Sequence, residues 1–417
     1  MFPIQVALLG YGNSAKTFHL PFLHSLPEYF QLKVILQRPR SADSNKPDAA
    51  KDYPSVEVVP DIDDTLKALP SGSLVIVTTS NASHVPFARK ALEANMHVLV
   101  EKPLAVNEEQ VNELEQLARS VGRVCTVYQN RRFDGDYLTL KKLLTTQDPA
   151  QNAVLGLPTL IESRFDRFRP IAKGGWREEV SPEQEGGGML WDLGAHLIDQ
   201  VVALYGAPET IFGTLQNQRG QGPDSVEDDW MAILTYPARQ PPVNGSFAKD
   251  SRLGGLRVVL GTTCLSTHID GEQPRFRVEG TLGSFVKKGT DPQEAQLKLG
   301  WTPKSHPDAF GSYDETQPES VRLARLTTTQ LSQDASASSP PELAVANIPT
   351  LPGRYEEIYK NLAMTIDAAN SSTSKQDANQ AIDQQLYVTL NQVSISTRII
   401  RLIRQSAKEE RVLRYKP

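Results

Sequence analysis

The sequence predicts two domains, a doubly wound parallel α/β sheet in residues 1–130 and an α+β domain on a mostly antiparallel, open-faced sheet in residues 131–417. Short apolar runs alternate with helical segments over residues 4–128, which is typical of a parallel sheet covered on both faces. After residue 130 the strand-like runs lengthen and lose the helices between them, which favours an antiparallel sheet. The 417 residues also exceed what one core normally supports, so two domains are expected.

The first predicted strand, Ile4–Leu9, runs into a glycine-rich turn, and a helical segment, Lys16–Ser25, follows it. The turn reads Gly10-Tyr11-Gly12-Asn13-Ser14-Ala15, the dinucleotide fingerprint with alanine in its last place. Gly10 permits the tight turn, Gly12 lets a pyrophosphate approach the backbone, and the helix start offers free amide groups to it. The residues expected to bind the dinucleotide here are Gly10, Gly12, Asn13, Ser14 and Ala15.

The stretch after the second predicted strand, Lys33–Leu36, indicates which dinucleotide is bound. A carboxylate here would hold the 2′-hydroxyl of NAD, but the chain reads Gln37-Arg38-Pro39-Arg40-Ser41. Arginine pairs with a 2′-phosphate that a carboxylate would repel. We therefore predict NADP(H) rather than NAD(H), with Arg38 as the main contact and Arg40 or Ser41 as helpers. The alternative is that both arginines are solvated loop residues.

The alternation of strands and helices continues to residue 128 and completes a six-stranded sheet. The further predicted strands are Val56–Val59, Leu74–Val77, His97–Val100 and Val124–Tyr128, and the predicted helices are Asp63–Leu69, Ala82–Ala94 and Glu108–Ser120. Ligands of such sheets bind at the carboxyl ends of the strands. The pair Glu101-Lys102, which precedes Pro103, would stand at that edge beside the polar turn Thr78–His84. Alternatively, the charged pair only solvates a strand end.

The second domain contains one strong helical pattern. It runs from Met189 to Tyr205, after three glycines at 186–188, and the predicted strands around it are Thr159–Phe168, Thr210–Leu215, Trp230–Tyr236, Leu256–Leu265, Arg275–Val278 and Gly283–Lys287. Asp192 and His196 are four residues apart and therefore neighbours on this helix. A carboxylate beside an imidazole raises its basicity, as proton transfer near pH 7 requires. The pair could instead serve stability, or share a metal. We expect no metal, because no second pair of His or Cys residues lies at the spacing that metal ligands require.

Polar composition marks residues 300–350 as a surface excursion or mobile loop, and helical patterns return at Tyr355–Ala369 and Gln376–Gln405. We expect the last helix to pack back on the first domain. The net charge of −5 and pI near 5.9 show no nucleic-acid footprint. Two cysteines, no signal-peptide pattern and no run of 18 apolar residues predict a cytoplasmic protein that binds no membrane.

These motifs together resemble the glucose-fructose oxidoreductase / inositol dehydrogenase (Gfo/Idh/MocA) family, over nearly the whole chain. The resemblance is carried by Gly10-Tyr11-Gly12, Asn81, His84, Glu101-Lys102-Pro103, Arg131-Arg132-Phe133-Asp134, Phe165–Pro170, Asp192-Leu193-Gly194-Ala195-His196 and Gly280–Phe285. It implies hydride transfer between a nicotinamide and a sugar-like or polyol alcohol/carbonyl pair. It also implies a homodimer or homotetramer.

The resemblance also implies roles for single residues. Lys102 would touch both the substrate hydroxyl and the nicotinamide ribose, Asp192 would position substrate, and His196 would donate or accept a proton. Lys102 and His196 both stay open as the formal acid/base. The remaining cofactor candidates are Thr79, Asn81, His84, Glu101 and Asn130, and the substrate candidates are Arg131, Asp166 and Trp176. Asp166 and Trp176 would form a sugar-binding rim with Arg169 and Arg177; alternatively, these four are ordinary surface residues. The alternative function is a non-catalytic nucleotide- and sugar-binding sensor or regulator on the same fold.

Overall fold

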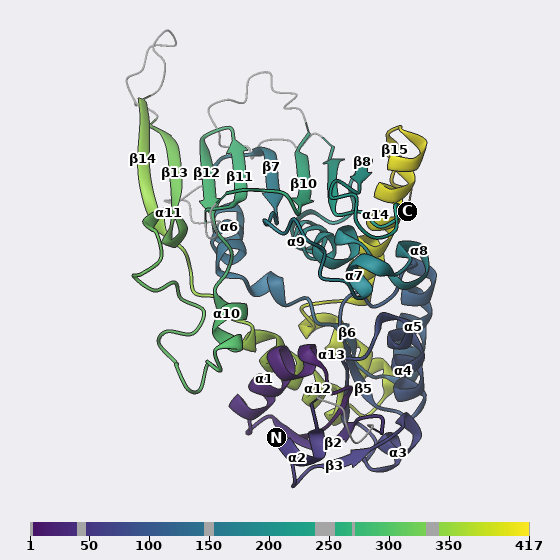
Figure 1. Cartoon of the computed structure of the whole chain (residues 1–417). Helices are drawn as coiled ribbons and strands as arrows, with labels where there is room; N and C mark the ends of the chain where they lie inside the picture. The colour runs from purple at the N-terminus through teal and green to yellow at the C-terminus, as the bar shows by residue number, and fades with distance from the viewer. Residues whose placement is uncertain are drawn as a thin grey trace. The chain divides into compact units, whose positions relative to one another are not determined.

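The computed structural model describes residues 3–39, 47–145, 154–237, 255–268, 272–330 and 342–416 (Figure 1). Arg40 and Ser41 lie outside these ranges. The chain divides into two compact units, each described by itself. Unit 1 comprises Met1–Phe133, Pro292–Gly311 and Arg354–Thr397, and unit 2 comprises Asp134–Asp291, Ser312–Gly353 and Arg398–Pro417. The chain therefore enters unit 1 three times.

Unit 1 is built on a six-stranded sheet in which every pair of neighbours is parallel, in the order β3-β2-β1-β4-β5-β6. This is the doubly wound arrangement that the sequence predicts, and the predicted fold class is confirmed. All four residues of β4 and of β5 are buried, which explains why β4 is a continuous apolar run and why β5 is apolar after its first residue, His97. The strands are β1 (Ile4–Leu9), β2 (Phe30–Leu36), β3 (Glu57–Val59), β4 (Leu74–Val77), β5 (His97–Val100) and β6 (Cys125–Val127).

Helices connect these strands and cover the sheet. In α5 the Asn107 side chain accepts a hydrogen bond from the Gln110 amide, and Gly122, at φ +68°, ends the helix. The helices up to residue 133 are η1 (Ala15–His19, a π-helix), α1 (Leu20–Ser25), α2 (Ala49–Asp52), α3 (Ile62–Lys67), α4 (Asn81–Glu93), α5 (Glu108–Val121) and η2 (Asn130–Phe133). Later segments add α10 (Gln293–Lys298), α12 (Glu356–Ser371), α13 (Lys375–Gln385) and the start of α14 (Leu390–Glu409), whose residues from Arg398 onward belong to unit 2.

The single helix predicted over 376–405 is wrong, because α13 and α14 are separated at residues 386–389. Asn361 replaces the missing helical bonds: its amide donates to the Gln385 carbonyl at 2.7 Å, and its oxygen accepts from the Tyr387 amide at 3.0 Å. The Val388 carbonyl accepts from the Thr126 hydroxyl at 2.7 Å. Partners distant in sequence stop the helix, so the local pattern could not show the break.

The C-terminal segments of unit 1 complete the cores on the two faces of its sheet. Val388, Leu390 and Val393 join the cluster that contains Val98 and Val100. On the other face Tyr355, Tyr359 and Leu362 join the cluster that contains Leu8 and Phe22. The cores on the two faces of the sheet are therefore complete only when residues beyond 354 are in place.

His97, the first residue of β5, is buried in unit 1 as a neutral imidazole. Its Nδ1 accepts from the Val124 amide at 2.9 Å, so Nε2 carries the hydrogen and donates to Asn370 Oδ1 at 3.1 Å. Burial lowers the pKa of His97 to about 3. In the unfolded chain the ring takes up a proton near pH 6.5, so lower pH favours unfolding.

We expect the free energy of unfolding of unit 1 to fall as the pH drops from 6.5 toward 3, by up to about 1.4 kcal/mol per pH unit from His97 alone. His97→Asn keeps an acceptor near the Val124 amide and removes the titrating group. Urea unfolding at several pH values should therefore show the stability advantage of the wild type shrinking with falling pH. A constant difference between the two proteins from pH 7 to 5 would contradict this assignment.

Unit 2 is built on a nine-stranded sheet in the order β14-β13-β12-β11-β7-β10-β9-β8-β15, in which only β7 and β10 pair in parallel among the described residues (Figure 1). The mostly antiparallel sheet is therefore confirmed. Its strands are β7 (Pro158–Arg164), β8 (Thr210–Gln216), β9 (Asp229–Thr235), β10 (Arg257–Thr263), β11 (Pro274–Gly280), β12 (Gly283–Lys288), β13 (Leu323–Gln330), β14 (Glu342–Pro349) and β15 (Leu413–Arg414). Its helices are α6 (Gly135–Thr145), α7 (Trp176–Glu179), α8 (Pro182–Glu185), η3 (Leu190–Gly194, a π-helix), α9 (Ala195–Tyr205) and α11 (Glu319–Arg322).

Within residues 300–350, where the sequence predicts a surface excursion or mobile loop, the structure contains the two strands β13 and β14. β13 pairs with β12, and β14 pairs with β13 along its whole length as the edge of the sheet. Most β14 residues are exposed, so this edge strand needs few apolar side chains. Its polar composition therefore looks like that of a loop.

Candidate functional site

The glycine-rich turn of unit 1 has the geometry that the fingerprint requires. Gly10 has φ +99°, and a Cβ there would lie 3.1 Å from the Thr78 carbonyl oxygen, so a larger residue would be strained and crowded. The Gly10 amide donates to the Leu36 carbonyl at 3.0 Å, which joins the ends of β1 and β2. Beside Gly12, by contrast, no atom lies within 4 Å of the place a Cβ would take. The turn therefore offers a backbone surface that a pyrophosphate fits.

Glu101, directly after β5, ties the strand end to the helix that follows the turn. Its Oε1 accepts from the Ser14 hydroxyl and lies 3.0 Å from His19 Nε2, and its Oε2 accepts from the Lys102 amide at 3.1 Å. Burial raises the pKa of Glu101, but the contacts with His19, Ser14 and Lys102 outweigh burial and hold it below its usual value. The predicted candidates Ser14 and Glu101 are thus in direct contact, and His19, which the sequence analysis did not predict as a site residue, is a further partner of Glu101.

His84, on α4, holds the loop that carries Lys102. Its Nδ1 lies 2.8 Å from the Pro103 carbonyl oxygen and its Nε2 lies 3.0 Å from that of Thr79. The residue is only 1% exposed, and burial lowers its pKa. His84 therefore joins the ends of β4 and β5. Lys102, Thr79 and Asn81 are partly exposed at the same edge.

Arg38 is exposed two residues beyond Leu36, and so lies at the strand end that bonds Gly10. The neighbouring Gln37 holds the residues that lead into α2 close to the end of β2. Its side chain donates to the Pro47 carbonyl at 2.7 Å and accepts from the Ala49 amide at 2.8 Å. No carboxylate stands between Leu36 and Pro39. This edge of unit 1 thus presents an arginine where an NAD site would present an acid.

Asn130 and Arg131 are both buried in η2. Arg131 donates to Glu294 Oε2 at 2.8 Å. Burial raises the pKa of Glu294, but the charges of Arg131 and Lys298 hold it below its usual value. Glu294 lies far along the chain from η2, so no sequence signal connected it with Arg131.

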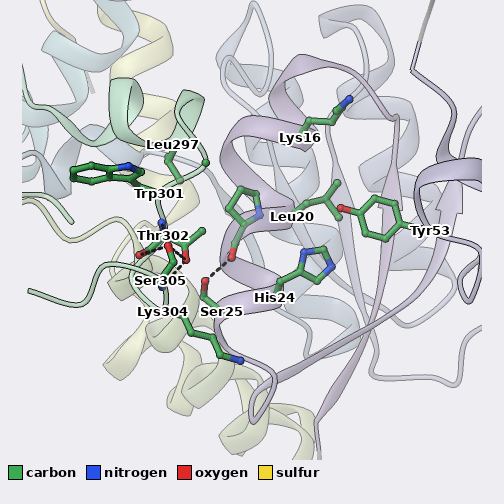
Figure 2. A pocket seen from close by; sticks show the side chains of 12 residues that line it. Lys16, Leu20, His24, Ser25, Tyr53, Leu297, Trp301, Thr302, Lys304 and Ser305 are labelled. Atoms are coloured by element: carbon green, nitrogen blue, oxygen red, sulfur yellow. Dashed lines mark hydrogen bonds between the residues drawn. The ribbon is translucent and has the colours of Figure 1, made fainter. Parts of the chain in front are cut away.

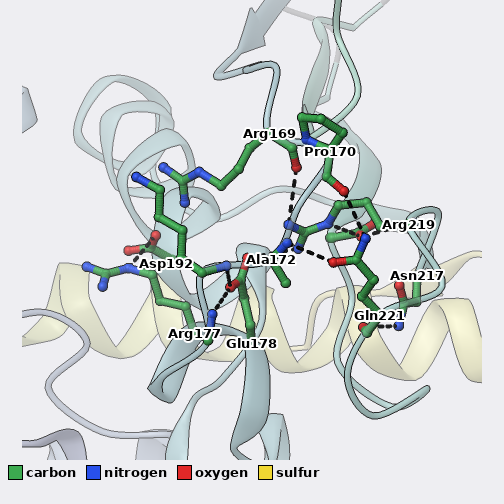
Figure 3. Close-up of polar contacts among 12 residues, drawn as sticks. Arg169, Pro170, Ala172, Arg177, Glu178, Asp192, Asn217, Arg219 and Gln221 are labelled. Atoms are coloured by element: carbon green, nitrogen blue, oxygen red, sulfur yellow. Dashed lines mark hydrogen bonds and ion pairs between the residues drawn. The ribbon is translucent and has the colours of Figure 1, made fainter.

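In unit 2, Asp192 lies in η3 and His196 lies in the first turn of α9, both buried. Asp192 Oδ2 accepts from Arg177 Nε at 2.8 Å (Figure 3). The Arg177 guanidinium lies 4.5 Å from the centre of the Trp176 ring. A π-helix does not follow the α-helical spacing on which the expected Asp192–His196 contact rests. That contact stays a prediction.

Both carboxylate oxygens of Asp166, another substrate candidate, accept hydrogen bonds from residues of unit 2. Its two oxygens accept from Arg164 at 2.6 and 3.0 Å, and Oδ1 also accepts from the Thr263 amide at 3.0 Å. These contacts favour a structural role for Asp166 over the predicted substrate contact.

Unit 1 also has an open pocket of about 500 Å³ that contains none of the predicted site residues. It lies beside α1, with Trp301 on one wall and the stacked rings of His24 and Tyr53 on another (Figure 2). Among the described residues, no group of three or more His, Cys, Asp or Glu side chains is placed to hold a metal ion. Within those same ranges no helix is long and apolar enough to cross a membrane.

Comparison with known families accounts for both units. Residues 4–129 match the family described as oxidoreductase family, NAD-binding Rossmann fold, and residues 143–286 match the GFO/IDH/MocA C-terminal domain. The chain belongs to the Gfo/Idh/MocA family of oxidoreductases. The resemblance expected from the sequence motifs is thereby confirmed, together with an NAD(P)-binding fold.

Relatives in this family cover nearly the full chain. The uncharacterised oxidoreductase C115.03 of Schizosaccharomyces pombe is 36% identical over 92% of this chain and 95% of its own length. The scyllo-inositol 2-dehydrogenase (NADP(+)) IolW of Bacillus subtilis is 29% identical over 98% of this chain and 95% of its own length. The oxidoreductase YvaA of Bacillus subtilis has a solved structure that superposes with a TM-score of 0.78, at 27% identity and with 100% and 99% of the two chains covered.

Proposed function

We propose that this Gfo/Idh/MocA protein is an NADP(H)-dependent dehydrogenase or reductase of a sugar-like or polyol substrate, located in the cytoplasm as a homodimer or homotetramer. The observation that carries the proposal is that Lys102 follows β5 on the sheet edge where the Gly10 turn follows β1. A relative named scyllo-inositol 2-dehydrogenase (NADP(+)) supports both the cofactor and the substrate class.

The bound nicotinamide would supply or accept the hydride at the substrate carbinol carbon. The Lys102 ammonium would stabilise the negative charge that develops on the substrate oxygen. Lys102 or His196 would move the hydroxyl proton. Asp192 and Arg177 would bind substrate hydroxyls, and Trp176 would offer an apolar ring face to a sugar. The contacts of Glu101 with Ser14 and His19 would keep the cofactor turn and the Lys102 loop in register.

We propose that Arg38 selects NADP(H) by binding the 2′-phosphate. Arg38→Ala should raise the Kd of NADPH about 10- to 100-fold and leave that of NADH nearly unchanged, because only NADPH loses a charge-assisted contact. Arg89→Ala, an exposed arginine on α4 that pairs with Glu113, is the matched control. Fluorescence titration of both variants with both nucleotides measures this, and an equal loss for NADPH and NADH would show that Arg38 does not contact the phosphate.

The function itself is tested by titrating the purified protein with NADPH and NADH and then assaying a panel of sugars and polyols with the tighter cofactor. Tight NADPH binding with turnover of any panel member supports the enzyme. Tight binding with no turnover, together with a change in cofactor affinity when a sugar is added, supports the sensor instead.

A further inference from the structure

Arg177 contacts both ends of the turn that leads to Asp192. Its side chain donates to Asp192 Oδ2 at 2.8 Å (Figure 3). Its backbone carbonyl accepts from the Gly188 amide at 2.8 Å. The Arg177 side chain is 45% exposed. An ion pair with one partner this exposed is weakened by solvent and does not by itself fix the Arg177 side chain. Something else must hold Arg177 in place.

The residue after Arg177 belongs to a buried charged cluster of Glu178, Arg219 and Asp228, whose side chains are 6%, 3% and 4% exposed. Arg219 donates to Glu178 Oε1 at 2.9 Å and to Asp228 Oδ2 at 2.6 Å. It also donates to the Arg169 carbonyl at 3.2 Å. Removing one member of such a buried cluster leaves an uncompensated charge, so the cluster strongly favours a single arrangement.

The cluster fixes the chain that precedes α7 as well. Glu178 Oε2 accepts from the amides of Lys173 and Gly174 at 2.6 and 2.7 Å, so the loop wraps around this carboxylate. Gln221 adds two bonds, from the Ala172 amide at 2.8 Å and to the Pro170 carbonyl at 2.9 Å. Residues 169–178 are thereby fastened to the connection between β8 and β9.

We propose that Arg219 and Glu178 are positioning residues, which fix α7 so that Arg177 holds the Asp192 carboxylate in its substrate-binding orientation. This inference rests on the proposed function of Asp192 and deepens it. The guanidinium of Arg219 reaches two carboxylates and a carbonyl at once, which the ammonium of a lysine cannot do with the same geometry.

Hydrogen exchange tests the positioning without any turnover. In Arg219→Lys the amides of two segments, residues 172–178 and the Gly188 end of 188–192, should exchange at least about tenfold faster than in the wild type. The first segment loses its fixed partner, and Gly188 donates to the Arg177 carbonyl, which is then no longer held in place. Glu178→Gln, which keeps an acceptor oxygen, should give a smaller increase in the same two segments and covers the case in which Arg219→Lys folds poorly. Lys173→Gln, an exposed charge change in the same loop, should alter neither segment. Faster exchange at 172–178 alone would overturn the proposal.

Kinetics test whether Arg219 acts through Arg177. With a polyol that the wild type turns over, Arg177→Met and Arg219→Lys should each raise KM about tenfold and leave the Kd of NADPH within twofold. The double variant should be no worse than the worse single variant, because both changes act on one contact. Effects that multiply in the double variant would overturn the proposal. If the wild type turns over nothing, the proposed function fails, whereas hydrogen exchange still decides whether Arg219 fixes the turn.

Discussion

Lys102→Met is expected to lower kcat with the best panel substrate by at least about 1000-fold, because it removes both the ammonium that stabilises the developing alkoxide and one candidate for proton transfer. The Kd of NADPH should rise only slightly, because the expected contact of Lys102 with the nicotinamide ribose is lost while the glycine turn and the contacts of Glu101 with Ser14 and His19 stay in place. Stopped-flow measurement of the single-turnover rate with saturating NADPH separates the chemical step from binding.

Lys67→Met provides the control for this prediction. Lys67 is 76% exposed on α3 and pairs with the half-exposed Asp64, so its replacement should leave turnover unchanged. Unchanged single-turnover rates in Lys102→Met would remove Lys102 from the reaction. They would leave His196 as the candidate for proton transfer.

Arg404→Met is expected to lower the free energy of unfolding of unit 2 by about 3–5 kcal/mol. Arg404, on α14, donates to Glu227 Oε2 at 2.7 Å, and the Glu227 side chain is only 3% exposed. Glu227 Oε1 in turn accepts from the Leu190 amide at 3.0 Å, at the start of the helix that carries Asp192. Without Arg404 the Glu227 carboxylate would be buried without its cation at the base of the candidate site.

The pH dependence of that loss has a defined sign. Burial raises the pKa of Glu227 even with Arg404 present, and removing the cation would raise it further. The folded variant would therefore hold more protons than the unfolded chain near neutral pH, so its stability should recover as the pH falls. Urea unfolding at pH 8 and pH 5.5 measures this.

Glu183→Gln is the matched control, because Glu183 is the other carboxylate that Arg404 contacts but is 65% exposed. Its loss should cost at most about 1 kcal/mol. Equal destabilisation by Arg404→Met and Glu183→Gln would show that the buried pair of Arg404 and Glu227 contributes no more to the free energy of unfolding than the exposed pair does.

The fold could be predicted from the sequence because its signals are local. A buried parallel strand such as β4 is apolar throughout, and the turn after β1 needs glycine at a positive φ, so both appear directly in the residues. The edge strand β14 could not be predicted, because an exposed edge imposes no apolar pattern. The break between α13 and α14 was missed because Asn361, on another helix, supplies the bonds that end α13.

The candidate site was also predictable only where its signals are local. Lys102 and Glu101 stand out because a charged pair ends a buried strand. The partners that hold the candidates in place did not stand out, since Tyr359 and Glu294 are single residues of common types far along the chain. Tyr359 lies 2.8 Å from His19 Nδ1, and Glu294 binds Arg131. Such pairs depend on tertiary packing, which spacing within one segment does not encode.

Because unit 1 is built from three separate segments of the chain, the ribosome completes it only late in synthesis. The strands and the glycine turn of unit 1 emerge first, yet Tyr355, Tyr359 and Val388, which cover the two faces of its sheet, emerge after the whole sheet of unit 2 except β15. During synthesis the first part of unit 1 therefore keeps apolar surface of its sheet exposed until those residues have been made. Partly folded chains in this condition bind chaperones or aggregate. A fragment ending at Phe133 should accordingly be insoluble, and the cofactor would bind only after nearly the whole chain has been made.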